Sequence, residues 1–304
     1  MGSEDVLSGV FYIANSRIAL FFDQLVPAQS QHDHSVTLMV FNTEQNRSET
    51  QLVVHADPKA FDITNGPDGG VLFGREGALN FYNSSLQPLR SIPLAPGTTG
   101  VRFNRILNQL VILTVDEKSG DRTAHFKDGS SLEESASLSY PIKSQAVFGK
   151  DELVYLLSGN CRGASHVMSA RVVWHGLDQL SACDPLAFIE KDSLAYASGD
   201  RLYIVDSKSH SLLNLRIPAP STFQLPQFVG LSDDHTRLAI SALRREKFTS
   251  EWPYYDEIFI YDLVSKRMIF EHALKKGSPN GALSPDGRQL ATIEEGILTL
   301  LSLP

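Results

Sequence analysis

The chain has 304 residues, of which 42% are hydrophobic and 20% are charged, so it can bury a large core and is neither disordered nor a coiled coil. Its 27 lysines and arginines against 35 aspartates and glutamates give a formal charge of −8, which provides no general attraction to nucleic acid or anionic lipid. No clean apolar stretch reaches the roughly 20 residues that a membrane-spanning helix needs. These properties predict a soluble protein with no membrane insertion and no nucleic-acid partner.

Short apolar runs rich in β-branched and aromatic residues follow one another along the whole chain, with Asn, Asp, Gly and Ser between them. In chain order, clear examples are residues 18–22, 36–41, 110–113, 153–157 and 258–261. Such runs predict strands, and no stretch longer than about ten residues keeps the period of a helix. The sequence therefore predicts an all-β protein.

A turn recurs between a first and a second apolar run, as in YIANSRIALFF, VFGKDELVYLL and ALSPDGRQLATI. Its copies are anchored on Asn15, Asp68, Asn108, Asp151, Asp192, Asp234 and Asp286. The mean spacing is about 45 residues, which is the length of one four-stranded propeller blade.

A second marker with nearly the same period lies where the third apolar run stops at a small polar residue or a histidine. Its copies are Asn42, Asn83, Asp128, His175, Asp206, Asp262 and Ser302. Because Asp and Asn side chains cap the backbone amides of tight turns, we expect this marker to begin the turn into a fourth strand.

Three segments resemble the blade signatures of bacterial WD-repeat, TolB-like and YVTN-type β-propellers. They are LSDDHTRLA at 231–239, IFIYDLVSKR at 258–267 and LSPDGRQLA at 283–291, whereas the Gly-His and Trp-Asp dipeptides of the strict WD repeat are missing. The resemblance implies a seven-bladed β-propeller with four-stranded antiparallel blades. It implies the fold alone, because propellers include both binding proteins and enzymes.

The expected blades form one domain over residues 1–304 and span residues 9–55, 60–94, 100–141, 145–183, 185–218, 226–274 and 281–303. The seventh blade contains only three runs, and an unpaired sheet edge is a liability. Propellers of this class usually close the ring with a strand lent by the other terminus. We therefore expect residues 4–7 to complete the seventh blade.

The connections between second and third strands all emerge on one rim, and three of them are long. They span residues 23–34 in blade 1, 158–166 in blade 4 and 243–257 in blade 6. Long connections on a rigid scaffold often carry function, so the sequence predicts a binding rim at this place.

The blade 6 connection, LRREKFTSEWPYYDE, combines arginines with aromatic residues, a mixture that is enriched at binding hot spots. The candidate binding residues are Arg244, Arg245, Phe248, Trp252, Tyr254 and Tyr255. Two interpretations are open: these side chains anchor a protein, peptide or carbohydrate, or the aromatic rings fold back over neighbouring blades.

Two further pairs have chemical alternatives. His32 and His34 flank Asp33 in the blade 1 connection and could ligate zinc or copper, or simply belong to a solvated polar loop. Cys161 and Cys183 are expected on the same face of blade 4, where they form either one disulfide or two free thiols. No spacing in the sequence predicts a cofactor.

Catalytic motifs such as the GxSxG elbow are missing, so no catalytic residue is assigned. We expect a non-catalytic scaffold that binds a protein or another ligand through the rim of blades 1, 4 and 6. Two alternatives are a propeller-type hydrolase resembling lactonases, with its site at the central channel, and a periplasmic accessory protein of an envelope complex. The expected compartment is cytoplasmic by default, and periplasmic or secreted if a signal peptide precedes Gly2.

Overall fold

The computed structural model describes residues 5–24, 35–55, 61–75, 77–104, 108–140, 144–148, 153–158, 166–169, 173–174, 185–190, 193–198, 201–206, 211–218, 227–245, 254–274 and 281–304. In these ranges the chain forms 27 strands in seven antiparallel sheets, together with one short 3-10 helix, η1 (Pro67–Gly69). The prediction of an all-β fold is confirmed. Within the same ranges, no helix has the length and apolar character needed to cross a bilayer.

Each sheet is referred to as a blade and numbered along the chain. Blade 1 contains β1 (Asp5–Ala14), β2 (Arg17–Gln24), β3 (Ser35–Asn42) and β4 (Arg47–His55). Blade 2 contains β5 (Phe61–Asn65), β6 (Val71–Arg75), β7 (Ala78–Tyr82) and β8 (Pro88–Pro93). Blade 3 contains β9 (Thr98–Asn104), β10 (Gln109–Val115), β11 (Arg122–Asp128) and β12 (Glu134–Tyr140).

The remaining blades follow in the same strand order. Blade 4 contains β13 (Ser144–Phe148), β14 (Leu153–Ser158), β15 (His166–Ser169) and β16 (Val173–Trp174). Blade 5 contains β17 (Pro185–Glu190), β18 (Ser193–Ser198), β19 (Arg201–Asp206) and β20 (Ser211–Arg216). Blade 6 contains β21 (Gln227–Leu231), β22 (Arg237–Arg245), β23 (Tyr254–Asp262) and β24 (Arg267–Ala273). Blade 7 contains β25 (Gly281–Leu283), β26 (Gln289–Glu294) and β27 (Ile297–Ser302).

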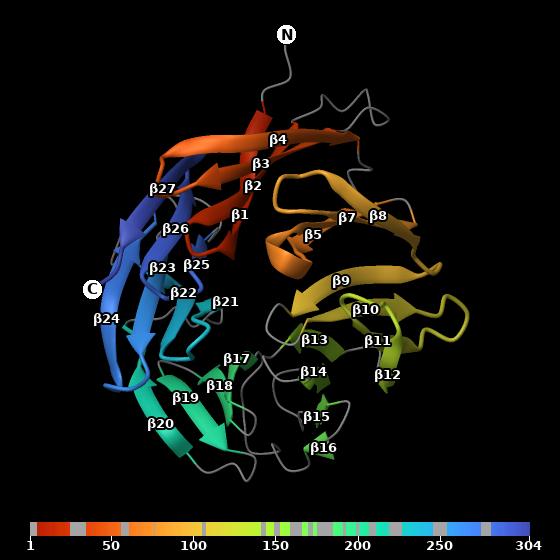
Figure 1. The fold of residues 1–304 in the computed structure, drawn as a ribbon. Coiled ribbons are helices and arrows are strands. Elements are labelled where there is room, and N and C mark those ends of the chain that lie inside the picture. The colour runs from red at the N-terminus through yellow and green to blue at the C-terminus, as the bar shows by residue number, and fades with distance from the viewer. Residues whose placement is uncertain are drawn as a thin grey trace.

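The blades stand around one axis, with the first strand of each blade innermost and its last strand at the periphery (Figure 1). Inner strands of neighbouring blades contact each other: β1 with β5, β5 with β9, β13 with β17, β17 with β21, β21 with β25, and β25 with β1. The arrangement is that of a β-propeller, and the seven sheets fit the expected number of blades.

Apolar clusters join neighbouring blades. Leu38 and Val40 of blade 1 are buried against Val71 and Phe73 of blade 2. Similar clusters join blades 2 and 3, 5 and 6, 6 and 7, and 7 and 1. Because a small isolated sheet leaves both of its apolar faces in water, each blade depends on its neighbours for stability.

The expected closure of blade 7 by the N-terminal segment is wrong. Residues 5–7 extend β1 and pair with residues 22–24 of β2, so they belong to blade 1. Pairing of residues 5–7 with β2 closes only a short loop. It therefore costs less conformational entropy than pairing of the same residues with blade 7 at the other end of the chain. The ring closes instead by packing of blade 1 on blade 7, where Tyr12 Oη also donates a hydrogen bond to Gln289 Oε1 at 2.9 Å.

In four blades the polar residue at the end of the third strand caps the next turn, as its position predicts. The prediction is wrong for blade 4, where Val173–Trp174, the strand before His175, is the fourth strand β16 and not the third. Asp128 Oδ1 accepts hydrogen bonds from the N–H groups of Ser130 and Ser131 at 2.9 and 2.7 Å. The same role is taken at the equivalent positions by Asn42, Asn83 and Asp262. In blades 1, 2, 3 and 6 these caps set the path into the fourth strand.

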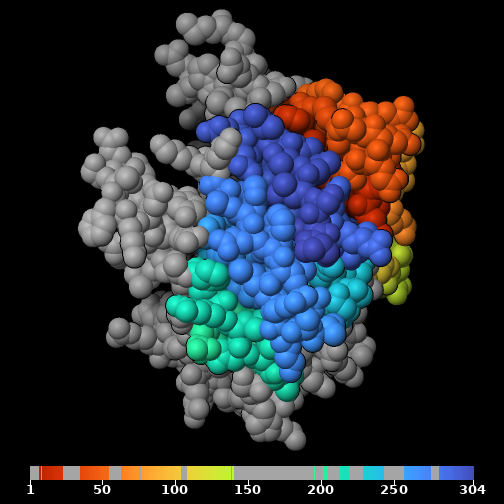
Figure 2. Space-filling model, turned by 90° about the vertical axis from the view of Figure 1, so that its left-hand side faces the viewer, coloured from red at the N-terminus to blue at the C-terminus, as the bar shows by residue number. Residues whose placement is uncertain are grey.

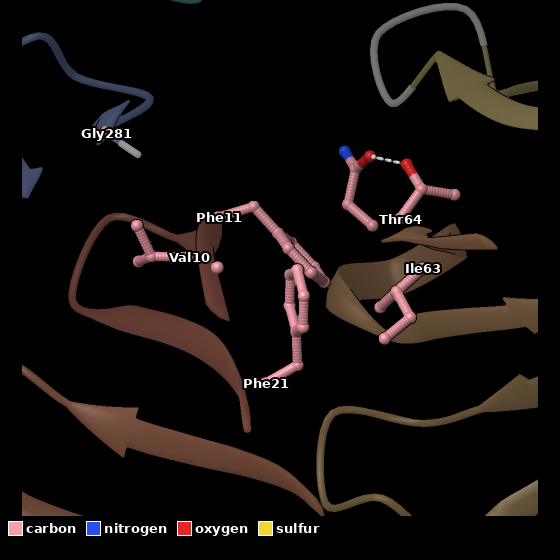
Figure 3. Close-up of a pocket in the computed structure, with 8 residues that line it drawn as sticks. Val10, Phe11, Phe21, Ile63, Thr64 and Gly281 are labelled. Atoms are coloured by element: carbon pink, nitrogen blue, oxygen red, sulfur yellow. Dashed lines mark hydrogen bonds between the residues drawn. The ribbon is translucent and has the colours of Figure 1, made fainter. Parts of the chain in front are cut away.

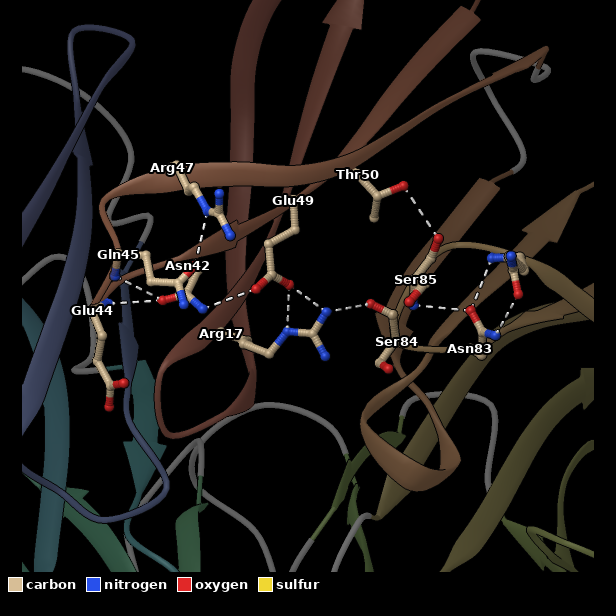
Figure 4. A network of polar contacts seen from close by, with 11 residues as sticks. Arg17, Asn42, Glu44, Gln45, Arg47, Glu49, Thr50, Asn83, Ser84 and Ser85 are labelled. Carbon is tan, nitrogen blue, oxygen red and sulfur yellow. Dashed lines mark hydrogen bonds and ion pairs between the residues drawn. The ribbon is translucent and has the colours of Figure 1, made fainter.

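A polar network joins blades 1 and 2 on the face that carries these turns (Figure 4). Arg17 Nε donates to Glu49 Oε2 at 2.7 Å, and Arg17 Nη2 donates to the carbonyl of Ser84 in blade 2 at 2.9 Å. Asn42 Nδ2 donates to Glu49 Oε1 at 2.9 Å. The hydrogen bond from Asn42 lowers the pKa of Glu49, burial opposes this change, and the hydrogen bond and charge of Arg17 lower the pKa further. Glu49 is therefore ionised at neutral pH and holds Arg17 toward blade 2.

Candidate functional site

The structure covers the predicted binding rim in part. Six of the predicted site residues lie outside the described ranges: His32, His34, Cys161, Cys183, Phe248 and Trp252. The metal-site and disulfide hypotheses therefore stay predictions. In the part of the chain that is described, no group of three or more His, Cys, Asp and Glu side chains is arranged to hold a metal ion.

The described part of the blade 6 connection continues two strands. The sequence places an irregular connection over residues 243–257, but β22 continues to Arg245 and β23 begins at Tyr254. In this ladder Arg244 lies opposite Tyr255, and Arg245 lies opposite Tyr254. Tyrosine favours strands, and pairing satisfies backbone groups that an open loop would leave to water.

The two strands extend beyond the rest of their sheet. Along β22, pairing with β21 stops at Ser241, and along β23, pairing with β24 starts at Glu257, as far as the described residues show. Among the described residues, 243–245 and 254–256 pair with each other and with no further strand. We refer to this two-stranded extension as the blade 6 ribbon.

The blade 6 ribbon grows from a buried base. Ala242, Glu257 and Ile258, which adjoin it in sequence, are all buried, and Ile258 packs in the cluster between blades 6 and 7. A ribbon whose base is fixed in the core has a defined direction relative to the rest of the propeller. Such a projection suits recognition better than a free loop, because less backbone entropy is lost on binding.

A pocket of about 280 Å³ lies near the axis, between blades 1, 2 and 7 (Figure 3). Its lining consists of Gly9, Val10, Phe11, Phe21, Ile63, Thr64, Asn65 and Gly281. Figure 3 shows the rings of Phe11 and Phe21 pointing toward each other and toward Ile63. One wall of the pocket is therefore aromatic.

Gly9 allows Phe21 to reach this wall. A Cβ atom at residue 9 would lie 2.0 Å from Cε1 of Phe21, far inside the normal separation of two carbon atoms. The ring of Phe21 thus occupies the space that any other side chain at residue 9 would need.

The polar part of the pocket comes from β5. Thr64 Oγ1 donates a hydrogen bond to Asn65 Oδ1 at 3.0 Å, which orients the Asn65 amide so that Nδ2 serves as a donor. The lining residues carry no ionisable side chain. This arrangement can hold a small neutral ligand with a flat apolar group and a hydrogen-bond acceptor. The sequence analysis missed the pocket because three separate blades contribute to it.

Comparison with known proteins gives similarity in structure alone. No family model matches the chain, and no curated protein matches it. A chain in the crystal structure of the mitotic checkpoint complex is similar with a TM-score of 0.60 and 14% identity, over 99% of this chain and 90% of that chain. Hsv2 from Kluyveromyces marxianus is similar with a TM-score of 0.60 and 9% identity, over 98% of this chain and 93% of that chain.

An acylaminoacyl peptidase from Pyrococcus horikoshii is similar with a TM-score of 0.66 and 10% identity. The similarity covers 99% of this chain, which spans only 51% of the peptidase. Identities this low establish a fold and leave activity open, since one fold supports many functions. Together with the ring of antiparallel sheets, these similarities show that the chain has a β-propeller fold.

Proposed function

We propose that this protein is a non-catalytic β-propeller scaffold that binds a protein or peptide partner through the rim formed by the long connections of blades 1, 4 and 6. The observation that carries the proposal is the blade 6 ribbon, which extends past the described pairing of β22 with β21 and of β23 with β24. A base that is fixed in the core suits a recognition element on a propeller.

The composition of the blade 6 ribbon supports this function. Its register sets each of two arginines directly opposite a tyrosine. Arg and Tyr are enriched among the residues that dominate binding energy, because both combine a large contact area with directional hydrogen bonds. Residues that face each other across a ladder can act on the same group of a partner.

The charge of the ribbon indicates the chemistry of the partner. Arg244 and Arg245 place two positive charges on the ribbon, which also carries the negative charge of Asp256, in a chain whose formal charge is −8. An arginine on a binding element favours an acidic group of the partner. The partner we propose therefore presents an acidic segment that also contains apolar or aromatic side chains.

The decisive experiment compares captured proteins for three forms of the full chain: wild type, the double variant Trp252→Ala with Tyr255→Ala, and the control Leu89→Ala, which changes a side chain that is 63% exposed in blade 2. Captured proteins are quantified by mass spectrometry, and circular dichroism checks the fold. We expect a partner that is retained by wild type and the control and lost by the double variant. Identical capture by all three forms would reject the rim as the binding site.

The pocket near the axis favours a second candidate, a site at the central channel such as the hydrolase alternative requires. Its only hydroxyl among the lining residues, on Thr64, donates to the neutral amide of Asn65. A nucleophilic hydroxyl needs a base such as imidazole or carboxylate. The pocket therefore supports binding of a small neutral ligand better than hydrolysis.

We further propose that residues 1–304 form one propeller domain and that it is related to the bacterial WD-repeat, TolB-like and YVTN-type propellers. The turns of blades 6 and 7 support this kinship. Ser232 Oγ donates to Asp234 Oδ1 at 2.6 Å, and Ser284 Oγ donates to Asp286 Oδ1 at 2.7 Å, so the two sharpest repeats use the same turn chemistry. An envelope role is tested by reading the codons upstream of Gly2 for a signal peptide.

A further inference from the structure

Blade 7 differs from every other blade at its outer edge. The other six sheets each contain a fourth strand, whereas the described strands of blade 7 are β25, β26 and β27. In the described register, β27 pairs with β26 on one side and with no strand on the other. The outer edge of β27 is the surface considered in the following paragraphs.

The side chains of β27 are less buried than those of a third strand that has its fourth strand. In β23 of blade 6, which is paired on both sides, residues 257–261 are all buried. In β27 no side chain is buried, Leu298 and Leu300 are half-buried, and Ile297 is 64% exposed. Figure 2 shows the C-terminal residues, in dark blue, at the molecular surface between blade 6 and the red and orange residues of blade 1.

The edge also presents backbone groups in a regular row. The N–H of Leu303 donates to the carbonyl of Arg288 at 2.8 Å, toward β26. Because successive residues of a strand direct their N–H and C=O groups to opposite sides, those of Leu298, Leu300 and Ser302 point to the outer edge. An added strand would find a donor and an acceptor at each of these positions.

Charges of opposite sign mark the two ends of the edge. Arg288 adjoins the Ser302 end, because Gln289 is the partner of Ser302 in the ladder, and Glu295 precedes Ile297 at the other end. Arg288 and Glu295 are both exposed. An antiparallel strand would begin beside Arg288 and end beside Glu295, so the complementary segment is acidic at its amino end and basic at its carboxyl end.

We propose that the outer edge of β27 binds an extended segment of another polypeptide as the antiparallel fourth strand of blade 7. The segment has alternating apolar and polar residues, with an acidic amino end and a basic carboxyl end. Main-chain hydrogen bonds to β27 supply affinity, and the half-buried leucines select the apolar positions. The site lies apart from the blade 6 ribbon and does not depend on the function proposed for the rim.

The first test uses the full chain and a fluorescent peptide of about eight residues, long enough to span the six residues of β27 with one charge at each end. The peptide has Asp at the amino end, alternating Val and Thr, and Arg at the carboxyl end. We expect saturable binding by fluorescence anisotropy, and about fivefold weaker binding when the two charged residues are exchanged, since exposed ion pairs contribute little each. Equal binding of both peptides, or binding of neither, would overturn the proposal.

The second test changes one backbone donor. Ser302→Pro removes an outward N–H at an exposed position where a strand edge tolerates proline, and Ser302→Ala keeps that N–H. We expect about fivefold weaker peptide binding for Ser302→Pro and no change for Ser302→Ala. A peptide with N-methyl groups on the residues that face β27 tests the same bonds without altering the protein, and it should not bind. Peptide affinity that is unchanged by Ser302→Pro and by N-methylation of the peptide would contradict strand addition.

Two further measurements distinguish other occupants of the edge. If the amides of Leu298 and Leu300 are protected from hydrogen exchange without peptide, the edge is already covered within the chain, and the proposal fails. A concentration-dependent dimer in sedimentation that disappears with Ser302→Pro would show a second copy on the edge, which also overturns it. Unprotected amides that become protected on peptide addition, in a monomer, are the result we expect.

Discussion

Tyr12 of β1 and Gln289 of β26 form a hydrogen bond across the two ends of the ring, with 2.9 Å between Oη and Oε1 and 277 positions between them in sequence. Burial, and then the negative charge of Asp286, raise the pKa of the Tyr12 hydroxyl, so it stays protonated and can donate at neutral pH. The bond adjoins the apolar cluster that joins blades 1 and 7. Packing and this side-chain bond close the propeller where a shared strand was expected.

Removing the hydroxyl at this closure should destabilise the protein. Tyr12→Phe keeps the ring in the cluster but leaves Gln289 Oε1 without its donor, and we expect a loss of about 1 kcal/mol in the free energy of unfolding. Urea denaturation measures the loss. The matched control is Val264→Ala at an exposed position of blade 6, which should unfold like wild type. A Tyr12→Phe variant as stable as wild type would show that the bond does not contribute to closure.

Enlarging Gly9 should displace Phe21 from the axial pocket. Gly9→Ala introduces a methyl group that overlaps the Phe21 ring, and we expect a cost of roughly 1–3 kcal/mol. Phe21→Ala in the same chain removes the overlap, so the effects of the two substitutions should not add in a double-mutant cycle of unfolding free energies. Additive effects would mean that the ring of Phe21 does not lie over Gly9.

Asp262, the cap at the end of β23, should make the stability of the protein depend on pH. Hydrogen bonding from the backbone N–H of Ser265 lowers the pKa of Asp262 below its usual value. A carboxylate with a lower pKa in the folded state stabilises the protein above its unfolded pKa of about 3.9, and this contribution disappears as pH falls through the folded pKa.

The variant Asp262→Asn isolates this effect, because an amide oxygen accepts the same bond at every pH, as Asn42 and Asn83 do at equivalent turns. We expect the melting temperature of wild type to fall below that of Asp262→Asn, relative to their difference at neutral pH, as the pH decreases below about 4. Thermal unfolding followed by circular dichroism between neutral and acidic pH provides the measurement. Parallel pH profiles would exclude a contribution from the Asp262 carboxylate.

Arg90 should stabilise the boundary of blades 2 and 3 through the geometry of its guanidinium group as well as through its charge. Its guanidinium donates to the carbonyls of Gly129 and Ser130 at 2.7 Å each and lies 4.3 Å from the centre of the Phe81 ring. Lysine keeps the charge but cannot make this paired contact while covering the ring, so Arg90→Lys should cost about 1 kcal/mol. Arg267→Lys, at an exposed position, is the control in denaturant unfolding. Equal stability of the two variants would assign Arg90 a purely electrostatic role.

The strands and their repeated turns could be predicted from the amino-acid sequence. Residues such as Asp128 and Asn42 identify the turn into each fourth strand because the cap is a local bond, made to an amide two or three positions away. The period of about 45 residues then indicated a propeller, since a blade of four short strands occupies that length. Both signals depend on neighbours in sequence, which is why they can be read without coordinates.

Contacts between residues far apart in the sequence could not be predicted and required the folded structure. Residues 5–7 join β1, Arg244 and Tyr255 continue a ladder where an open connection was expected, and the axial pocket gathers residues from three blades. Each of these arrangements depends on which of several possible strands a segment pairs with and on how the blades pack. The alternative partner strands lie far apart in the sequence, so no short stretch of sequence contains both. For the same reason the open edge of β27 becomes visible only once all the sheets stand in their ring.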